Sequence, residues 1–311
     1  MIAHWDDAPS FRAERGHLAG TWSDLGAAVG SRGVGLKRIR VDPLRWSTPA
    51  HRHGAEEEIF YVLAGSGLSW QDGATCEVGP GDCLVHLPNR EAHTLRAGPD
   101  GLDVLAYGTR RPVEGSHLPR AGVAWLGETW VVAGPGEDPW SREAAAGEPE
   151  TPEPGPRPAN VLALADAPRA FDGQVALLGR TAGAEESGLN HTTLAPGRIG
   201  APPHCHTLEE EIFVVLEGSG ALELTPSPAR REVGAEPESH PVRAGTVVSR
   251  RAGTGIAHNL RAGEEGLVYL AYGTREANDI TYYPRSNKFW LRGVGLIGRV
   301  EPLPFMEGEE G

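Results

Sequence analysis

Short apolar runs bounded by charged residues and glycine recur along the whole chain. Residues 59–63 (IFYVL) and 212–216 (IFVVL) each follow three glutamates, and a glycine closes each run. Runs of this length and composition are typical of β-strands. The same criteria predict further strands at residues 35–41, 84–87, 102–107, 189–194, 246–249 and 267–272.

Turn dipeptides such as DG and PG separate these runs at intervals of about eight to twelve residues, the spacing of a sandwich or barrel. The one helix-like stretch, REAAA at 142–146, is too short to change the class. The pattern therefore predicts an all-β protein.

The strand pattern occurs twice. His51 and His204 stand 204 − 51 = 153 positions apart, and their surroundings match at the same offset. A second block of matches begins at His93 and His258, offset by 258 − 93 = 165, and contains LRAG and LAYGTR in both copies. Matched blocks in a fixed order, with length changes between them, indicate tandem duplication of one domain.

A segment rich in proline, glutamate and glycine separates the two copies. It occupies residues 134–159 and has almost no apolar periodicity, which predicts an extended linker or a surface excursion. We therefore predict one domain at residues 1–133 and a second at residues 160–311.

Composition and charge narrow the range of partners. The formal net charge is 29 − 42 = −13, which argues against nucleic acid or an anionic membrane surface as a partner. No segment approaches the roughly 18 apolar residues of a membrane span, and the N-terminal residues lack the features of a signal peptide. Three cysteines without a CxxC motif fit a reducing compartment, so we expect a cytoplasmic protein. The expected partner is a small-molecule substrate.

Two histidine pairs point to metal chemistry. HRH at 51–53 and HCH at 204–206 space their histidines by two residues, and on a strand such residues share one face. A single pair could equally be polar residues on an exposed strand face. Because the pair recurs in the same surroundings, metal binding is favoured, the commonest use of clustered imidazoles.

The residues around these pairs resemble the motifs of the cupin superfamily. HxHx4Ex6G at 51–65 and 204–218 is similar to the first cupin motif, and residues 81–93 and 245–258 are similar to the second. The resemblance implies a bicupin with two tandem double-stranded β-helix (jelly-roll) barrels. It also implies that each barrel binds one divalent metal through the following residues: His51, His53, Glu58 and His93 in the first, and His204, His206, Glu211 and His258 in the second.

Each copy has three consecutive glutamates, and the spacing of six residues to the motif glycine selects the third. The middle glutamates, Glu57 and Glu210, would point to the opposite strand face. The first glutamates, Glu56 and Glu209, are expected in a turn facing solvent.

Three neutral imidazoles and one carboxylate leave a net charge of +1 on a divalent ion. An octahedral ion would keep two positions open, which favours Fe(II) or Mn(II), with Zn or Ni as possible occupants.

The resemblance leaves the reaction open, because cupins include oxygenases, decarboxylases, isomerases, epimerases and binding proteins. We expect an oxidoreductase of dioxygenase type acting on a small organic acid or aromatic substrate, with catalytic residues undetermined. The alternatives are a redox-neutral isomerase, epimerase or decarboxylase, and a non-catalytic small-molecule-binding bicupin. The resemblance to oxalate decarboxylases is incomplete, since their substrate arginine is replaced by Thr48 and Ala201. Cupins commonly dimerise, so a homodimer is expected by resemblance.

Four further residues are candidates for lining the substrate pocket. Trp46, Phe60 and Phe213 could form an apolar wall, but as aromatics they could equally belong to the core. His86, with Ser249 near its place in the second copy, could face the cavity or point outward.

Overall fold

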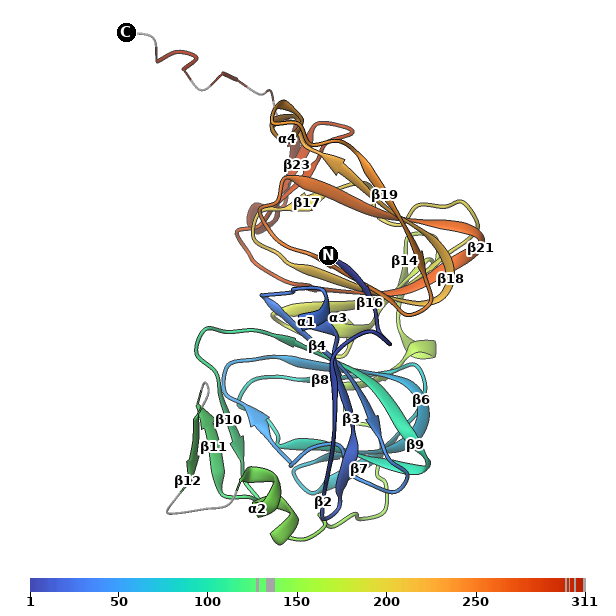
Figure 1. Ribbon diagram of the computed structural model, residues 1–311, viewed down its shortest axis with the longest axis vertical. Coiled ribbons are helices and arrows are strands. Elements are labelled where there is room, and N and C mark those ends of the chain that lie inside the picture. Colours follow the sequence, from blue (N-terminus) through green and yellow to red (C-terminus); the bar gives the residue numbers. More distant parts are fainter. Residues whose placement is uncertain (127–128, 133–137, 300, 302, 305, 310–311) are drawn as a thin grey trace.

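The computed structural model describes residues 1–126, 129–132, 138–299, 301, 303–304 and 306–309. They form two β domains, which we call barrel 1 and barrel 2. Figure 1 shows barrel 1 in the lower part of the view and barrel 2 in the upper part. Each barrel combines an eight-stranded and a four-stranded antiparallel sheet. The prediction of an all-β protein with two jelly-roll domains is confirmed. Among the described residues, no helix has the length and apolarity needed to cross a bilayer.

Barrel 1 contains a large sheet in the order β13-β8-β6-β9-β4-β3-β2, with β7 paired to β6. Its strands are β2 (Ser10–Arg15), β3 (Leu18–Asp24), β4 (Val34–Val41), β6 (Glu58–Gln71), β7 (Ala74–Val78), β8 (Asp82–His86), β9 (His93–Thr109) and β13 (Val161–Ala163). The small sheet, in the order β12-β11-β10-β5, consists of β5 (Arg52–His53), β10 (Gly115–Leu118), β11 (Val123–Leu126) and β12 (Thr129–Val132).

Barrel 2 repeats this plan with a large sheet in the order β1-β20-β18-β21-β16-β15-β14, with β19 paired to β18. Its strands are β1 (Ile2–His4), β14 (Arg169–Ala170), β15 (Val175–Leu177), β16 (Ser187–Leu194), β18 (Glu211–Pro226), β19 (Glu238–Arg243), β20 (Thr246–Arg250) and β21 (Ile256–Thr274). The small sheet follows the order β17 (Cys205–His206), β22 (Ile280–Tyr283), β23 (Lys288–Leu291) and β24 (Leu296–Arg299).

The helices are short. They are α1 (Leu25–Ala28), α2 (Pro139–Ala145), α3 (Leu178–Thr181) and α4 (Pro228–Glu232), with single turns η1 (Leu164–Asp166) and η2 (Arg292–Val294). Helices α1 and α3 lie between the two barrels (Figure 1).

The apolar runs of the sequence lie within strands, but two strands continue past the motif glycine. Gly65 in β6 has φ +79°, and a Cβ there would lie 2.2 Å from the Gly101 carbonyl oxygen. The pairing of β6 with β9 shifts register at this point. Glycine is therefore needed at the point where the register of the strand shifts.

The described part of the predicted linker lies against barrel 1. Its helix α2 begins at Pro139, capped by Asp138, and includes most of the REAAA stretch. The Glu148 carboxylate accepts a hydrogen bond from Trp46 Nε1 at 2.9 Å, and Arg157 pairs with Asp82 at 2.6 Å. These contacts match a surface excursion rather than a free connector. The start of the linker, at residues 134–137, falls outside the described residues.

Strand pairing crosses the predicted division of the chain. The N-terminal strand β1 pairs with β20 of barrel 2, although it precedes all of barrel 1. Strand β13, which follows the linker, pairs with β8 of barrel 1. Each barrel therefore completes the edge of its large sheet with a strand from the other half of the chain.

The barrels meet through an apolar core and two buried carboxylates. One continuous cluster includes Leu36 and Ile59 from barrel 1 and Leu189 from barrel 2. At its centre the rings of Tyr107 and Tyr272, which belong to the repeated LAYGTR, stack with centroids 4.9 Å apart.

The middle glutamates of the two glutamate triplets reach across this interface. Glu57 accepts hydrogen bonds from the backbone of Glu185 (2.7 Å) and Glu186 (3.1 Å) and from the Ser187 hydroxyl. Glu210 does the same in reverse.

The Glu210 carboxylate of barrel 2 accepts hydrogen bonds from three residues of barrel 1. The donors are Ser31 Oγ at 2.8 Å, the Arg32 N–H at 3.2 Å and the Gly33 N–H at 2.6 Å. Both glutamates point away from the third glutamate of their triplet, as the strand alternation predicts. Glu57 and Glu210 therefore form contacts between the two barrels.

Candidate metal centres

In barrel 1 three strands bring four predicted ligands together. His51 directly precedes β5 and His53 is its last residue. Glu58 is the first residue of β6, and His93 is the first residue of β9. The Glu58 Oε2 atom lies 3.8 Å from His51 Nε2, 3.6 Å from His53 Nε2 and 2.9 Å from His93 Nε2. One ligand atom from each of the four residues lies within 4.8 Å of the others.

Barrel 2 repeats the arrangement. The Glu211 Oε2 atom lies 3.5 Å from His204 Nε2, 3.4 Å from His206 Nε2 and 2.8 Å from His258 Nε2. Three of these residues, His204, Glu211 and His258, satisfy the same mutual distance limit. His206 lies outside this group of three, but its Nε2 atom contacts Glu211 Oε2.

The other ring nitrogens of the first histidines are anchored to the protein. His51 Nδ1 lies 2.9 Å from the Pro49 carbonyl oxygen, and His204 Nδ1 lies 2.7 Å from that of Pro202. A carbonyl oxygen can only accept, so Nδ1 carries the proton and Nε2 keeps a free lone pair. This is the tautomer that a metal ion needs.

The second histidine of each pair is anchored by a carboxylate. His53 Nδ1 lies 3.2 Å from Glu114 Oε1, and His206 Nδ1 lies 2.7 Å from Asp279 Oδ2. Such carboxylate–histidine pairs orient a ligand and raise its basicity. Because these carboxylates hold Nδ1, we treat them as supports of the same centre rather than as a second metal site.

Several buried ligand atoms have no hydrogen-bond partner. They are His53 Nε2 in barrel 1 and His206 Nε2, Glu211 Oε2 and His258 Nε2 in barrel 2. Unpartnered buried polar atoms are costly, yet these converge on one point in each barrel. A divalent cation at that point would satisfy them all, so the residues present fit a metal ion.

The electrostatics of both centres favour a cation. Burial opposes ionisation of Glu58, but the neighbouring imidazoles of His53 and His93 outweigh it and hold the Glu58 pKa well below its ordinary value. The Glu211 pKa is lowered in the same way, chiefly by His206. Burial lowers the pKa of His51 to about 3. Burial opposes protonation of His53 and His206, but their carboxylate neighbours outweigh it and raise the pKa of each to about 10. A metal ion would have to displace the Nε2 proton of these two rings, because ionised carboxylates and neutral imidazoles are the forms that bind a metal.

The remaining glutamates of the triplets differ from expectation in one case. Glu56 is half-buried and accepts a hydrogen bond from the Arg111 N–H at 3.0 Å. Glu209 was expected in solvent, and that prediction is wrong. Its side chain is 4% exposed, because Arg292 from η2 covers it with an ion pair of 2.6 Å. Burial raises the pKa of Glu209 to about 7.

Three of the four predicted pocket residues lie beside the clusters. The ring of Phe60 meets His93 edge-on at 6.1 Å, and the ring of Phe213 meets His258 edge-on at 5.4 Å. His86 faces inward: its ring stacks on His93 with centroids 3.8 Å apart, and its Nδ1 lies 2.7 Å from Glu91 Oε1.

Trp46 is not brought to either cluster. It is fully buried among Leu18, Trp70 and Ala92 beneath the linker segment, where it serves the core. It is therefore left out of the site proposed below.

The sequence reasoning missed the supporting carboxylates Glu114 and Asp279. A signal was present, because 279 − 114 = 165 is the offset of the second block of matches. It also missed the neighbours of the second cluster, Arg250 and Tyr283, which differ in type from their counterparts in barrel 1.

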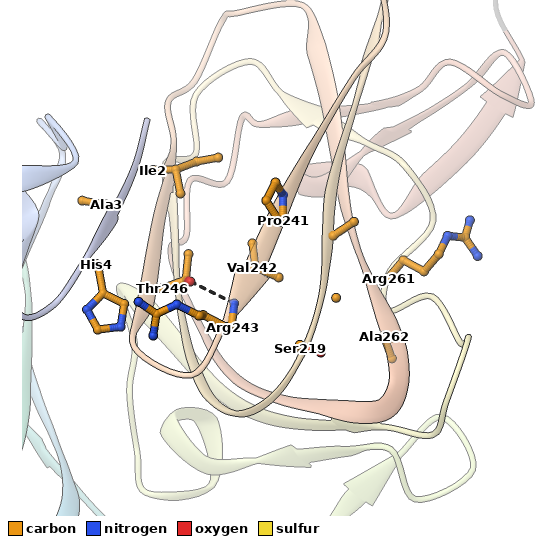
Figure 2. Close-up of a pocket in the computed structure, with 13 residues that line it drawn as sticks. Ile2, Ala3, His4, Ser219, Pro241, Val242, Arg243, Thr246, Arg261 and Ala262 are labelled. Atoms are coloured by element: carbon orange, nitrogen blue, oxygen red, sulfur yellow. Dashed lines mark hydrogen bonds between the residues drawn. The ribbon is translucent and has the colours of Figure 1, made fainter.

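A surface cavity lies away from both clusters. It has a volume of about 700 Å³ and is lined by β1 together with β18–β21, and no residue of either cluster lines it. Figure 2 shows His4 and Arg243 at its edge, where the Arg243 N–H donates to the Thr246 hydroxyl. The cavity marks the seam between the N-terminal strand and barrel 2.

Comparison with known proteins supports the cupin fold. Residues 37–105 match the cupin domain family (Cupin_2). No curated protein matches the chain by sequence. A structure of oxalate decarboxylase is similar over 88% of this chain and 76% of that one, with a TM-score of 0.60 at 16% identity. A structure of Bacillus subtilis oxalate decarboxylase with Mn(II) centres has the same coverage and a TM-score of 0.60 at 15% identity.

A structure of the Bacillus subtilis enzyme at pH 4.6 gives a TM-score of 0.59 at 16% identity, over 88% of this chain and 75% of that one. At these identities the likeness concerns the fold. The chain thus shares a two-domain fold with these structures, and its match to the cupin domain family covers residues 37–105.

Proposed function

We propose that the protein is a metal-dependent, redox-neutral enzyme of the decarboxylase type, acting on a small carboxylic acid that carries a second oxygen donor. The observation that carries the proposal is the convergence of three imidazole Nε2 atoms on one buried carboxylate oxygen in each barrel. The likeness to oxalate decarboxylase supports a decarboxylase better than the dioxygenase expected from the sequence.

Mn(II) is the favoured metal. Three imidazoles and one carboxylate would supply four ligands to a six-coordinate ion, which would leave room for a substrate with two oxygen donors. Mn(II) is also the metal of the similar Bacillus subtilis structure. Fe(II) suits the same donors, and Zn(II) or Ni(II) would compete for them.

The chain's own residues hold the site in place for this reaction. The Nδ1 anchors on Pro49, Pro202, Glu114 and Asp279 fix the imidazole planes, so that little reorganisation is needed when substrate arrives. The edge-on rings of Phe60 and Phe213 exclude water from one side of each cluster.

The reaction is balanced without an oxidant. The bond between the carboxylate carbon and its neighbour breaks, CO₂ leaves without the bonding electron pair, and a proton from water joins the carbon that keeps it. A bound divalent ion supplies Lewis acidity, which stabilises the negative charge on the substrate's second oxygen.

Oxalate itself is not the substrate that the residues favour. The positions three residues before His51 and His204 hold Thr48 and Ala201, neither of which has a positive charge to pair with a carboxylate. A β-keto acid fits the proposal better, since its keto oxygen is the second donor and takes up the negative charge as an enolate when CO₂ leaves.

The test is a turnover screen with the full chain, stripped of metal and reloaded with Mn(II) or Fe(II). Oxalate, a panel of keto acids, sugar epimers and catechols are offered, and CO₂ release and oxygen uptake are measured together. Release of CO₂ without oxygen uptake is expected. Oxygen uptake with an aromatic or acid substrate would instead establish the dioxygenase, and interconversion of sugars an epimerase.

The metal centres are tested separately by substitution. His51→Ala combined with His204→Ala should abolish metal retention while the protein stays folded. His117→Ala, an exposed histidine on β10, is the matched control and should retain metal. Undiminished metal in the double variant would refute the assignment.

A further inference from the structure

Arg250 occupies the place in barrel 2 that His86 occupies in barrel 1. Glu58 pairs with His86 in the register of β6 and β8, and Glu211 pairs with Arg250 in the register of β18 and β20. Residues directly opposite each other on antiparallel strands share a face. The side chain of Arg250 therefore starts on the same inner face as the Glu211 carboxylate.

This corrects the sequence comparison, which put Ser249 near the counterpart of His86. Ser249 pairs with Ile212, and its hydroxyl donates to Glu210 at 2.9 Å on the interdomain side.

The guanidinium of Arg250 is half-buried and incompletely satisfied. Its Nη2 donates to the Ile256 carbonyl oxygen at 3.1 Å, and its Nε is buried without a hydrogen-bond partner. Within the described residues, no ion pair includes Arg250. A buried cation without a partner is unfavourable, and arginine is rarely buried unless it is paired.

The charge of Arg250 reaches the metal cluster. Arg250 lies directly opposite Glu211 in the strand register, and its Nη2 donates to the carbonyl oxygen of Ile256, two residues before His258. The Glu211 carboxylate itself faces the three histidines. Arg250 is therefore free to bind a second anion.

A second donor, Tyr283, lies beside the same cluster. Its ring stands 5.9 Å from that of His204 and is half-buried. The pairings His206 with Thr281 and His53 with Ser116 make Leu118 its counterpart in barrel 1. Barrel 2 thus has an arginine and a phenol where barrel 1 has a histidine and a leucine.

We propose that Arg250 is the residue that selects an anionic substrate, and that barrel 2 is the centre that takes the carboxylic acid. The inference rests on the proposed function, because the acid must reach the metal-binding face. The Nε and a terminal nitrogen of the guanidinium hold one carboxylate of the substrate in a two-point hydrogen bond. Tyr283 donates to a second oxygen.

The test measures binding of malonate to the Mn(II)-loaded full chain. In a His93→Ala background, which disables the barrel 1 cluster, the dissociation constant is followed by calorimetry and by the Mn(II) electron paramagnetic resonance spectrum. Arg250→Gln should weaken malonate binding roughly 10- to 100-fold, the loss expected for a charge-assisted hydrogen bond. Malonamide, which has no charge, should bind equally weakly to both proteins.

The controls separate binding from folding. Arg243→Gln changes an exposed arginine of the same barrel and should leave the malonate constant unchanged. Where Arg250→Gln loses Mn(II), Arg250→Lys keeps the charge but lacks the planar fork, and an intermediate constant is expected. Malonate binding that is unchanged in either Arg250 variant overturns the proposal, as does binding that survives His258→Ala.

The two proposals fail differently. Malonate binding that depends on Arg250, without CO₂ release from any acid, leaves the carboxylate site standing and removes the decarboxylase. CO₂ release whose KM is the same in Arg250→Gln leaves the decarboxylase and removes the role of Arg250.

Discussion

Replacing the interdomain glutamates should destabilise the whole molecule. Glu57 is fully buried and Glu210 is 5% exposed, and each carboxylate accepts at least three hydrogen bonds from the partner barrel. Alanine in place of Glu57 removes the acceptor of two backbone N–H groups and the Ser187 hydroxyl, and alanine in place of Glu210 removes the acceptor of two backbone N–H groups and the hydroxyls of Ser31 and Ser249.

The size of the effect follows from these contacts. A hydrogen bond to a charged group contributes about 1.5–3 kcal/mol, and a buried donor left without a partner costs about 1–3 kcal/mol. Water entering the space offsets part of the loss, so we expect roughly 2–4 kcal/mol for Glu57→Ala or Glu210→Ala. At about 2–4 °C per kcal/mol for a domain of this size, Tm should fall by roughly 5–15 °C.

Glutamine at the same positions keeps one acceptor oxygen, and its amide group can donate to the serine hydroxyls, so its cost should be smaller, about 1–2 kcal/mol. The double alanine variant should lose less than the sum of the two, because both carboxylates stabilise one interface. It should also unfold in two transitions.

The assay is guanidinium unfolding followed by tryptophan fluorescence and circular dichroism, with Glu264→Ala as the control. Glu264 is exposed on β21, where surface substitutions are usually within about 0.5 kcal/mol of neutral. If Glu57→Ala and Glu210→Ala fall within the same range as the control, the interface does not depend on these carboxylates and the reasoning is wrong.

Three further outcomes are expected. Glu114→Gln and Asp279→Asn should each weaken metal binding about 10- to 100-fold in their own barrel, because the histidine loses the group that orients it; a competition titration with a coloured chelator measures this, and unchanged affinity contradicts the supporting role. Burial raises the pKa of the Cys205 thiol to about 11 and that of Cys83 further still, so native protein at pH 8 should react with a disulfide reagent far more slowly than unfolded protein; rapid labelling of either would show that the thiol is accessible. Deletion of residues 1–4 should lower the stability of barrel 2 and leave that of barrel 1 unchanged, because β1 pairs with β20. Hydrogen exchange of the backbone amides measures this at β20 for barrel 2 and at β8 for barrel 1. Equal protection of β20 in the full and the truncated chain would mean that β1 does not stabilise barrel 2.

Local alternation predicted part of each cluster. A strand places residues i and i+2 on one face, so His51 and His53 had to point together, and the same rule separated Glu57 from Glu58. The resemblance to the cupin motifs then implied His93 and His258 as partners from distant strands. The structure brings all eight of these residues to the two predicted places.

What the sequence did not predict depends on contacts between elements far apart in the chain. The burial of Glu209 results from Arg292, which lies 292 − 209 = 83 residues further on. His86 stands 93 − 86 = 7 residues before His93, whereas Arg250 stands 258 − 250 = 8 residues before His258, so a one-residue ambiguity hid the match between His86 and Arg250. Trp46 could be assigned to the core only once the linker segment was seen to cover it.

The pairing of β1 with β20 also sets an order for synthesis. Residue 4 leaves the ribosome 246 − 4 = 242 residues before the first residue of its partner strand. At about 5–20 residues per second, the N-terminal strand waits roughly 10–50 s for its place in barrel 2. Barrel 1 likewise lacks its last edge strand until residue 163 has emerged. The newborn chain cannot finish its first half before starting its second, so the two halves mature together.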